Sequence, residues 1–107
     1  MIKAVIYRND NGNVNGFHVS GHAGYDERGY DIVCASVSML VVNTINSIET
    51  FTEDQFLCDV VEEDGDVTFR MEGDISKESA LLLDSMLLGI KAVEEDYGNE
   101  FITIIEK

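Results

Sequence analysis

The sequence predicts an α+β fold, a two-layer sandwich in which two helices pack on one mainly antiparallel sheet. Two observations support this fold class. Short segments with the period-two alternation of strands come in pairs joined by turn residues, and a long apolar segment with helical spacing follows each pair. The element order is therefore ββαββαβ, in which the hairpins leave too few crossovers for a parallel doubly wound sheet. We expect a single domain over residues 1–107, a length sufficient to bury one core without disulfides.

Five segments have the β-branched and aromatic content of strands. The first opens the chain as IKAVIYR, and the NDNGN that follows it holds the Asn and Gly that a hairpin turn requires. An Asp-Gly-Asp turn joins the third and fourth strands in the same way, and FITIIEK forms a last strand after the second helix. The expected strands cover residues 2–8, 14–21, 56–63, 66–73 and 101–107.

The second expected strand places its side chains on two faces. Period-two alternation puts Phe17 and Val19 on one face and His18 and Ser20 on the other. If the extended conformation continued beyond Ser20, His22 would join the His18 side. His18 itself is interpreted as an ordinary, partly exposed strand residue.

Two helices are expected, and they differ in character. The first runs from Ile32 to about Thr50 with Asp31 as its N-cap, and it is apolar on nearly every face. We expect its outer flank to pack on a second copy of the chain, as in a homodimer. The second is amphipathic, with Ser76 as N-cap and Gly98 as terminator. Its expected core positions are Leu83, Met86, Leu87, Ile90 and Val93.

The chain is strongly acidic, with a formal net charge of -14 at pH 7. A polyanion repels nucleic acid and anionic membranes and attracts basic partners, so direct binding to nucleic acid or to a membrane is disfavoured. The charge is also uneven, because residues 49–74 contain ten acidic residues against one basic residue, Arg70. This stretch is interpreted either as a solvated surface or as a surface for a basic partner.

The two cysteines, Cys34 and Cys58, are too few for a disulfide framework and lack the close pairing of zinc-binding cysteines. We expect reduced thiols and no metal or cofactor. The N-terminal MIKAVIYRND reaches charged residues too early for a signal peptide, and no stretch is expected to be long enough to span a membrane. The prediction is a cytoplasmic protein. Cys58 lies inside the third strand and is interpreted as a packing residue.

A glycine-rich loop precedes the first helix, with Gly21, Gly24 and Gly29. Glycine permits positive φ and the close approach of a ligand's main chain, so a binding cleft is expected here. With Asp31 as N-cap, Cys34 becomes the third residue of the first helical turn, where unpaired N–H groups and the helix dipole favour an anion. Cysteines at helix N-termini or beside histidine have pKa values from about 3.5 to 7.5, against roughly 8.5 for an unperturbed thiol. The position therefore favours a reactive thiolate.

A nucleophilic thiolate also needs a group that transfers protons near neutral pH, and His22 is the candidate. Asp31 either orients that imidazole or serves only as a cap. Ser38 lies one turn after Cys34, where its hydroxyl hydrogen-bonds near the site or to the helix backbone. Spacing alone leaves two interpretations open, a catalytic Cys-His pair or an inert small cysteine with a loop histidine.

The segment GHAGYDERGYDIVCASVSML, residues 21–40, resembles the signature of the bacterial ribosomal-processing cysteine protease family Prp, also called YsxB-like. The shared features are a Gly-His-Ala start, a glycine-bearing loop, Asp-Ile-Val-Cys-Ala, and a Ser four residues after the Cys. Position 36, often Ala in the family, is Ser36 here. The chain length, the acidic character and the element order also resemble the family, so the resemblance extends over the whole chain.

The resemblance implies a cysteine endopeptidase that removes a short N-terminal extension from the twenty-seventh protein of the large ribosomal subunit. By position, the family's catalytic pair falls on His22 and Cys34 and its supporting residues on Asp31 and Ser38. The family also forms homodimers. The implied partner is a basic ribosomal protein, which agrees with the acidic chain. The glycines of its mobile loop fall on Gly21, Gly24 and Gly29, and Tyr25 and Tyr30 are candidate walls of the substrate cleft.

Two other functions remain open. In the first, the chain is a noncatalytic ribosome-assembly module that binds a basic ribosomal protein through its acidic face. In the second, it carries a thiol or metal site. The metal site would use Cys34, His22, His18 and Cys58, a set whose spacing is unlike zinc-binding patterns.

Overall fold

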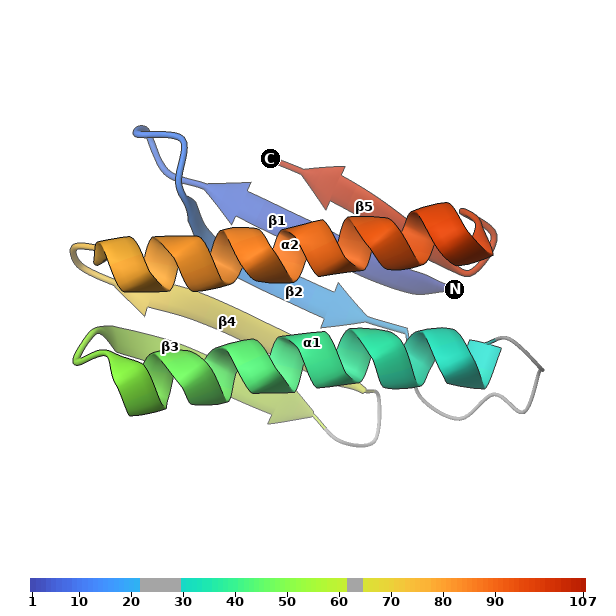
Figure 1. The fold of residues 1–107 in the computed structure, drawn as a ribbon, viewed down its shortest axis with the longest axis horizontal. Coiled ribbons are helices and arrows are strands. Elements are labelled where there is room, and N and C mark those ends of the chain that lie inside the picture. Colours follow the sequence, from blue (N-terminus) through green and yellow to red (C-terminus); the bar gives the residue numbers. More distant parts are fainter. Residues whose placement is uncertain (22–29, 62–64) are drawn as a thin grey trace.

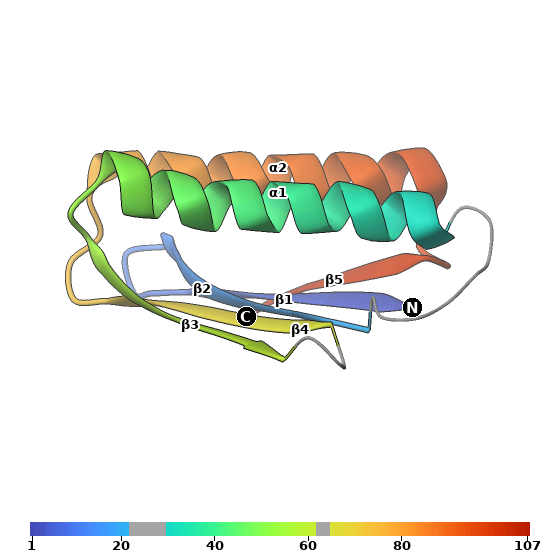
Figure 2. The same ribbon diagram turned by 90° about the horizontal axis from the view of Figure 1, so that it is seen from below.

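The computed structural model describes residues 1–21, 30–61 and 65–107, with the backbone alone at positions 30 and 31. A five-stranded sheet forms one layer, and two helices lie side by side across one of its faces (Figures 1 and 2). The predicted two-layer α+β sandwich and its ββαββαβ order are confirmed. The elements are β1 (Ile2–Arg8), β2 (Val14–Ser20), α1 (Tyr30–Phe51), β3 (Gln55–Val61), β4 (Asp66–Glu72), α2 (Lys77–Tyr97) and β5 (Ile102–Glu106).

The strand order across the sheet is β3-β4-β2-β1-β5. β1 with β2, β2 with β4 and β4 with β3 are antiparallel pairs, whereas β1 and β5 run parallel, with Ile2 opposite Ile102. The mainly antiparallel sheet is therefore confirmed. The predicted strands begin and end within one residue of the observed ones, apart from the last part of the third, where residues 62 and 63 lie outside the described residues.

The core lies between the sheet and the helices. Phe17 on β2 and Phe69 on β4 are opposite each other in register, and their rings stack with centroids 5.0 Å apart and an interplanar angle of 12°. Both are fully buried with Val19, whereas His18 and Ser20 lie on the uncovered face, as predicted. All five core positions expected on α2 are also buried: Leu83, Met86, Leu87, Ile90 and Val93.

The ends of α2 agree with the sequence prediction. Ser76 is the N-cap, and its side chain accepts a hydrogen bond from the Ser79 N–H, while Gly98 ends the helix with φ of 95°. The Asp54 carboxylate, between α1 and β3, accepts hydrogen bonds from the Ser76 N–H at 3.0 Å and from the Ser76 and Ser79 hydroxyls at 2.6 Å each. These bonds lower the pKa of Asp54, the Ser76 hydroxyl contributing most. One carboxylate thus connects the start of α2 to the segment after α1.

The start of α1 differs from the prediction. The helix begins at Tyr30, so Asp31 is its second residue and not the N-cap, and Cys34 is its fifth residue and not its third. A polar residue before an apolar run indicates a cap, but an acidic residue is also favourable inside the first turn because it interacts with the helix dipole. The two-residue shift moves Cys34 one turn into the helix.

The expectation that no segment could span a membrane was wrong by length and composition, since Ile32–Phe51 passes both criteria. Packing explains part of this apolar character, because one face of α1 packs on the core above the sheet and against α2 (Figure 2). The fully buried residues of that face are Val33, Val37, Val41 and Ile48. Ile32, Met39 and Val42 remain exposed. These residues, together with exposed Phe51, are available to the homodimer, which stays a prediction.

Candidate active site

Cys34 is half-buried and packs against the core from α1. Ser38 is one helical turn farther on, so the two side chains share one flank of the helix. Side chains on a helix lean toward its N-terminus, so the Cys34 thiol lies over the first turn of α1. The N–H groups that lack partners within a helix belong to that turn. The sulfur therefore still lies near the positive end of the helix dipole, although Cys34 is the fifth residue of α1.

An apolar pocket of about 260 Å³ opens beside this flank, between α1 and the sheet. Val42 and Val60, on its α1 and β3 walls, are exposed at its rim. Among the described lining residues Ser38 alone carries a hydroxyl, so an apolar side chain of a ligand is the natural occupant of the pocket. No local pattern in the sequence marks these valines as pocket residues, because the neighbourhood of α1 and β3 depends on the strand order. The lining residues are Val19, Val37, Ser38, Val41, Val42, Val60, Gly65 and Val67.

Gly21 ends β2 with a positive φ of 84°. A Cβ at this position would overlap the carbonyl oxygen of Met1, so glycine is required both by the conformation and by the close approach of the N-terminal backbone. The extended conformation that would have aligned His22 with His18 therefore stops at Gly21. The other predicted loop residues, His22, Gly24, Tyr25 and Gly29, lie outside the described residues. Tyr30 and Asp31 are described only as the backbone of the first turn of α1.

The other two residues of the metal-site alternative do not share the Cys34 flank. His18 is on the uncovered face of the sheet, where its Nε2 lies 3.5 Å from Asp66 Oδ2. Cys58 is on the edge strand β3 opposite Phe69 and is exposed. Although the residue as a whole is exposed, partial desolvation of its sulfur and, secondly, the charge of Asp59 raise the pKa of the Cys58 thiol. Cys58 therefore lacks the conditions for a reactive thiolate.

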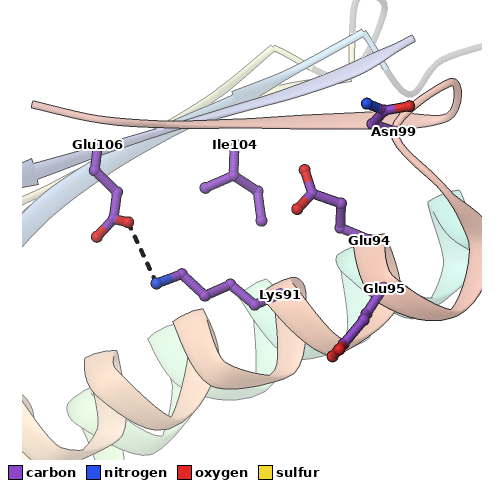
Figure 3. A pocket seen from close by; sticks show the side chains of 6 residues that line it. All are labelled: Lys91, Glu94, Glu95, Asn99, Ile104 and Glu106. Atoms are coloured by element: carbon purple, nitrogen blue, oxygen red, sulfur yellow. Dashed lines mark ion pairs between the residues drawn. The ribbon is translucent and has the colours of Figure 1, made fainter.

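A second, more open hollow of about 580 Å³ lies between α2 and β5 (Figure 3). Lys91 Nζ is 3.3 Å from the Glu106 carboxylate, which also accepts a hydrogen bond from Arg8 at 2.8 Å. The Arg8 bond first, and then the Lys91 bond, lowers the pKa of Glu106. The hollow is lined by Lys91, Glu94, Glu95, Asn99, Ile104 and Glu106, without a thiol or an imidazole. We interpret it as a solvated ion-pair surface, a kind that contributes little to stability.

A family model described as "Cysteine protease Prp" matches residues 1–102 of the chain. The chain belongs to the Prp family of cysteine proteases. The resemblance found in the segment around Cys34 is thus confirmed over nearly the whole sequence, and the chain is a cysteine protease by family.

Prp relatives match most of the chain. The ribosomal processing cysteine protease Prp of Bacillus subtilis (strain 168) is 29% identical over 101 residues, covering 91% of this chain and 90% of the relative. Its counterpart in Staphylococcus aureus (strain Mu50) is 33% identical over 98 residues, covering 92% of each.

Solved Prp structures confirm the fold. An S. aureus Prp in complex with a substrate peptide superposes with a TM-score of 0.93 at 32% identity, over 100% of both chains. The S. aureus enzyme with a covalently linked product peptide gives a TM-score of 0.89 at 33% identity, again over 100% of both.

Proposed function

We propose that this cysteine protease removes the N-terminal extension of the twenty-seventh protein of the large ribosomal subunit, in the cytoplasm, and so supports ribosome assembly. The observation that carries the proposal is the apolar pocket between α1 and the sheet, which gives an apolar side chain of a peptide a place beside Ser38, one helical turn from Cys34. The Prp relatives that match this chain are named for ribosomal processing, and one was solved with a substrate peptide.

In the proposed reaction the Cys34 thiolate attacks the scissile carbonyl and forms a C–S bond. The positive end of the α1 dipole stabilises both the thiolate and the oxyanion of the tetrahedral intermediate. His22, as imidazolium, gives its proton to the departing amine when the C–N bond breaks. Water, deprotonated by His22, then attacks the thioester, the C–S bond breaks to release the thiolate, and the new carboxylic acid loses its remaining proton to solvent. Asp31 and Ser38 are supporting residues in this scheme.

The charge of the chain supports a basic substrate. A net charge of -14 steers cationic peptides toward the surface, and ribosomal proteins are basic. In this proposal Gly21, Gly24 and Gly29 let the loop approach the substrate backbone, and Tyr25 and Tyr30 wall the cleft. The enzyme acts as a homodimer without a metal or cofactor.

The test is cleavage of the extended ribosomal protein by the purified enzyme, with the product mass fixing the cleavage site. Cys34→Ser and His22→Ala each abolish cleavage, whereas the matched control Cys58→Ser retains it because Cys58 is on β3 with a raised thiol pKa. Retained cleavage by Cys34→Ser would exclude that residue as the nucleophile. Binding of the substrate without cleavage by the wild type would favour the noncatalytic assembly module instead.

A further inference from the structure

β3 is an exposed edge of the sheet. Within the described parts of the chain it pairs with β4 alone, so its other side presents backbone N–H and C=O groups to solvent. Proteins normally protect such an edge with lysine, proline or a covering loop. The sequence of β3, QFLCDVV, contains no lysine, arginine or proline, and Leu57, Val60 and Val61 are exposed. Asp59 is the one charged residue of β3, so most of the edge is free of the groups that usually block the addition of a strand.

The two faces of β3 have different surroundings. Val60 lies opposite buried Val67 on the side of the helices and forms one rim of the apolar pocket, with Val42 of α1 as the other. Leu57 lies opposite Arg70 on the uncovered side of the sheet. A strand added at this edge would alternate its side chains between the pocket and the open face.

The same edge has an acidic end. Glu49, Glu53 and Asp54 border a hollow of about 330 Å³ together with Gln55 and Phe56, at the start of β3. From Gln55 to Val60 the strand advances five residues, which is roughly 17 Å. An extended peptide along β3 would thus meet the apolar pocket at Val60, near the end of β3, and the carboxylates of Glu53 and Asp54 at its start.

We infer that the substrate's main chain pairs with β3 as a sixth strand, directing one apolar side chain into the pocket between Val42 and Val60. The inference rests on the proposed function, because it names the binding mode of that same site. Main-chain hydrogen bonds supply affinity in this mode, and the pocket supplies selectivity for alternate side chains.

Charge identifies the occupant as a cationic peptide and not a second copy of the chain. Two copies paired through β3 would bring together edges that carry Asp59 and the flanking Glu53 and Asp54. The carboxylates of two such edges repel one another, whereas a basic peptide neutralises them. The edge therefore favours a peptide that carries basic residues on the Glu53 and Asp54 side of its apolar residue.

The main-chain pairing is tested with synthetic peptides spanning the cleavage site of the extended ribosomal protein, each N-methylated at one residue. Successive N–H groups of a strand point in opposite directions, so methylation at alternate residues removes a donor to β3 and raises KM by about tenfold or more. Methylation at the residues between them leaves KM nearly unchanged. A loss without period-two alternation would overturn the pairing.

The pocket is tested with a matched pair of substitutions on the same strand. Val60 and Leu57 are equally exposed, at 54% and 56%, so neither change disturbs the core. Val60→Asp places a carboxylate at the pocket and raises KM by about tenfold, while Leu57→Asp on the other face changes KM less than about twofold.

The outcomes separate the two proposals. If the wild type cleaves the peptide but Val60→Asp behaves like Leu57→Asp, the binding mode is wrong and the proposed function stands. If the wild type does not cleave the extended protein or its peptide, the proposed function fails and the binding mode fails with it. If Val60→Asp leaves KM unchanged but dissociates a dimer in light scattering, a second copy occupies the edge and the inference is overturned.

Discussion

Replacement of Gly21 by alanine tests whether the junction between β2 and the His22 segment is fixed by backbone geometry. The residue has φ of 84°, and its missing side chain leaves room for the Met1 carbonyl oxygen. Alanine would therefore be disfavoured twice, once by its conformation and once by its overlap with the N-terminal backbone.

The structure offers a control that separates these two effects. Gly12, in the β1–β2 turn, has nearly the same φ, 83°, but nothing lies within 4 Å of the Cβ that alanine would add. Gly12→Ala should lower the free energy of unfolding only by the conformational cost of a positive φ, about 1–2 kcal/mol. Gly21→Ala should lower the free energy of unfolding by that amount and by roughly 1–2 kcal/mol more, because relieving the overlap must move the start of β1 or twist the end of β2.

The free energies of unfolding are measured by urea denaturation of the two variants and the wild type, followed by circular dichroism. We expect Gly21→Ala to be the less stable variant by at least about 1 kcal/mol, with reduced protease activity under native conditions. Equal stabilities of the two variants would show that the close approach to Met1 has no energetic consequence, and would refute the reasoning.

Four further outcomes follow from the structure. In Cys58→Ser the remaining Cys34 should react quickly with iodoacetamide at pH 7, whereas in Cys34→Ser the remaining Cys58 should react slowly because its pKa is raised. Asp54→Ala should lower the free energy of unfolding at pH 7 by about 1–2 kcal/mol through loss of its hydrogen bonds to serine. Because folding lowers the Asp54 pKa, its contribution is complete above the unfolded value near 3.8, so the two proteins should converge in stability as the pH falls below it. Leu83→Ala should destabilise the fold by about 2–5 kcal/mol in thermal or urea unfolding, since Leu83 is fully buried. Raising the salt concentration should lower kcat/KM for a basic substrate more than kcat, and a flat response would remove the steering role of the acidic surface.

Local features of the chain predicted most of the fold. The strand ends followed from alternation and turn residues, and both ends of α2 followed from a serine cap and a glycine terminator, Ser76 and Gly98. The start of α1 was missed because Asp31 is favourable both at a cap and inside a first turn. In each case the physics that decided the outcome acts within a few residues.

The site was predictable only in part, for a different reason. The chemistry of Cys34 and the shared flank with Ser38 depend on one helix, whereas the pocket between Val42 and Val60 depends on β3 and β4 lying under α1. Alternation does not fix the order of strands, so no local pattern pointed to Val60. The approach of His22 to Cys34 involves residues outside the described part and stays a prediction.

The parallel pairing of β1 with β5 bears on how the protein is made. On the side of β1 away from β2, Ile2 pairs with Ile102. Nearly the entire described chain must therefore be synthesised before β1 is flanked by two strands. Closing so long a loop is entropically unfavourable and slows the step that completes the sheet. In a nascent chain still held on the ribosome, α1 with its Cys34 thiol would therefore pack on a sheet that lacks β5. Full activity would appear only after β5 has emerged.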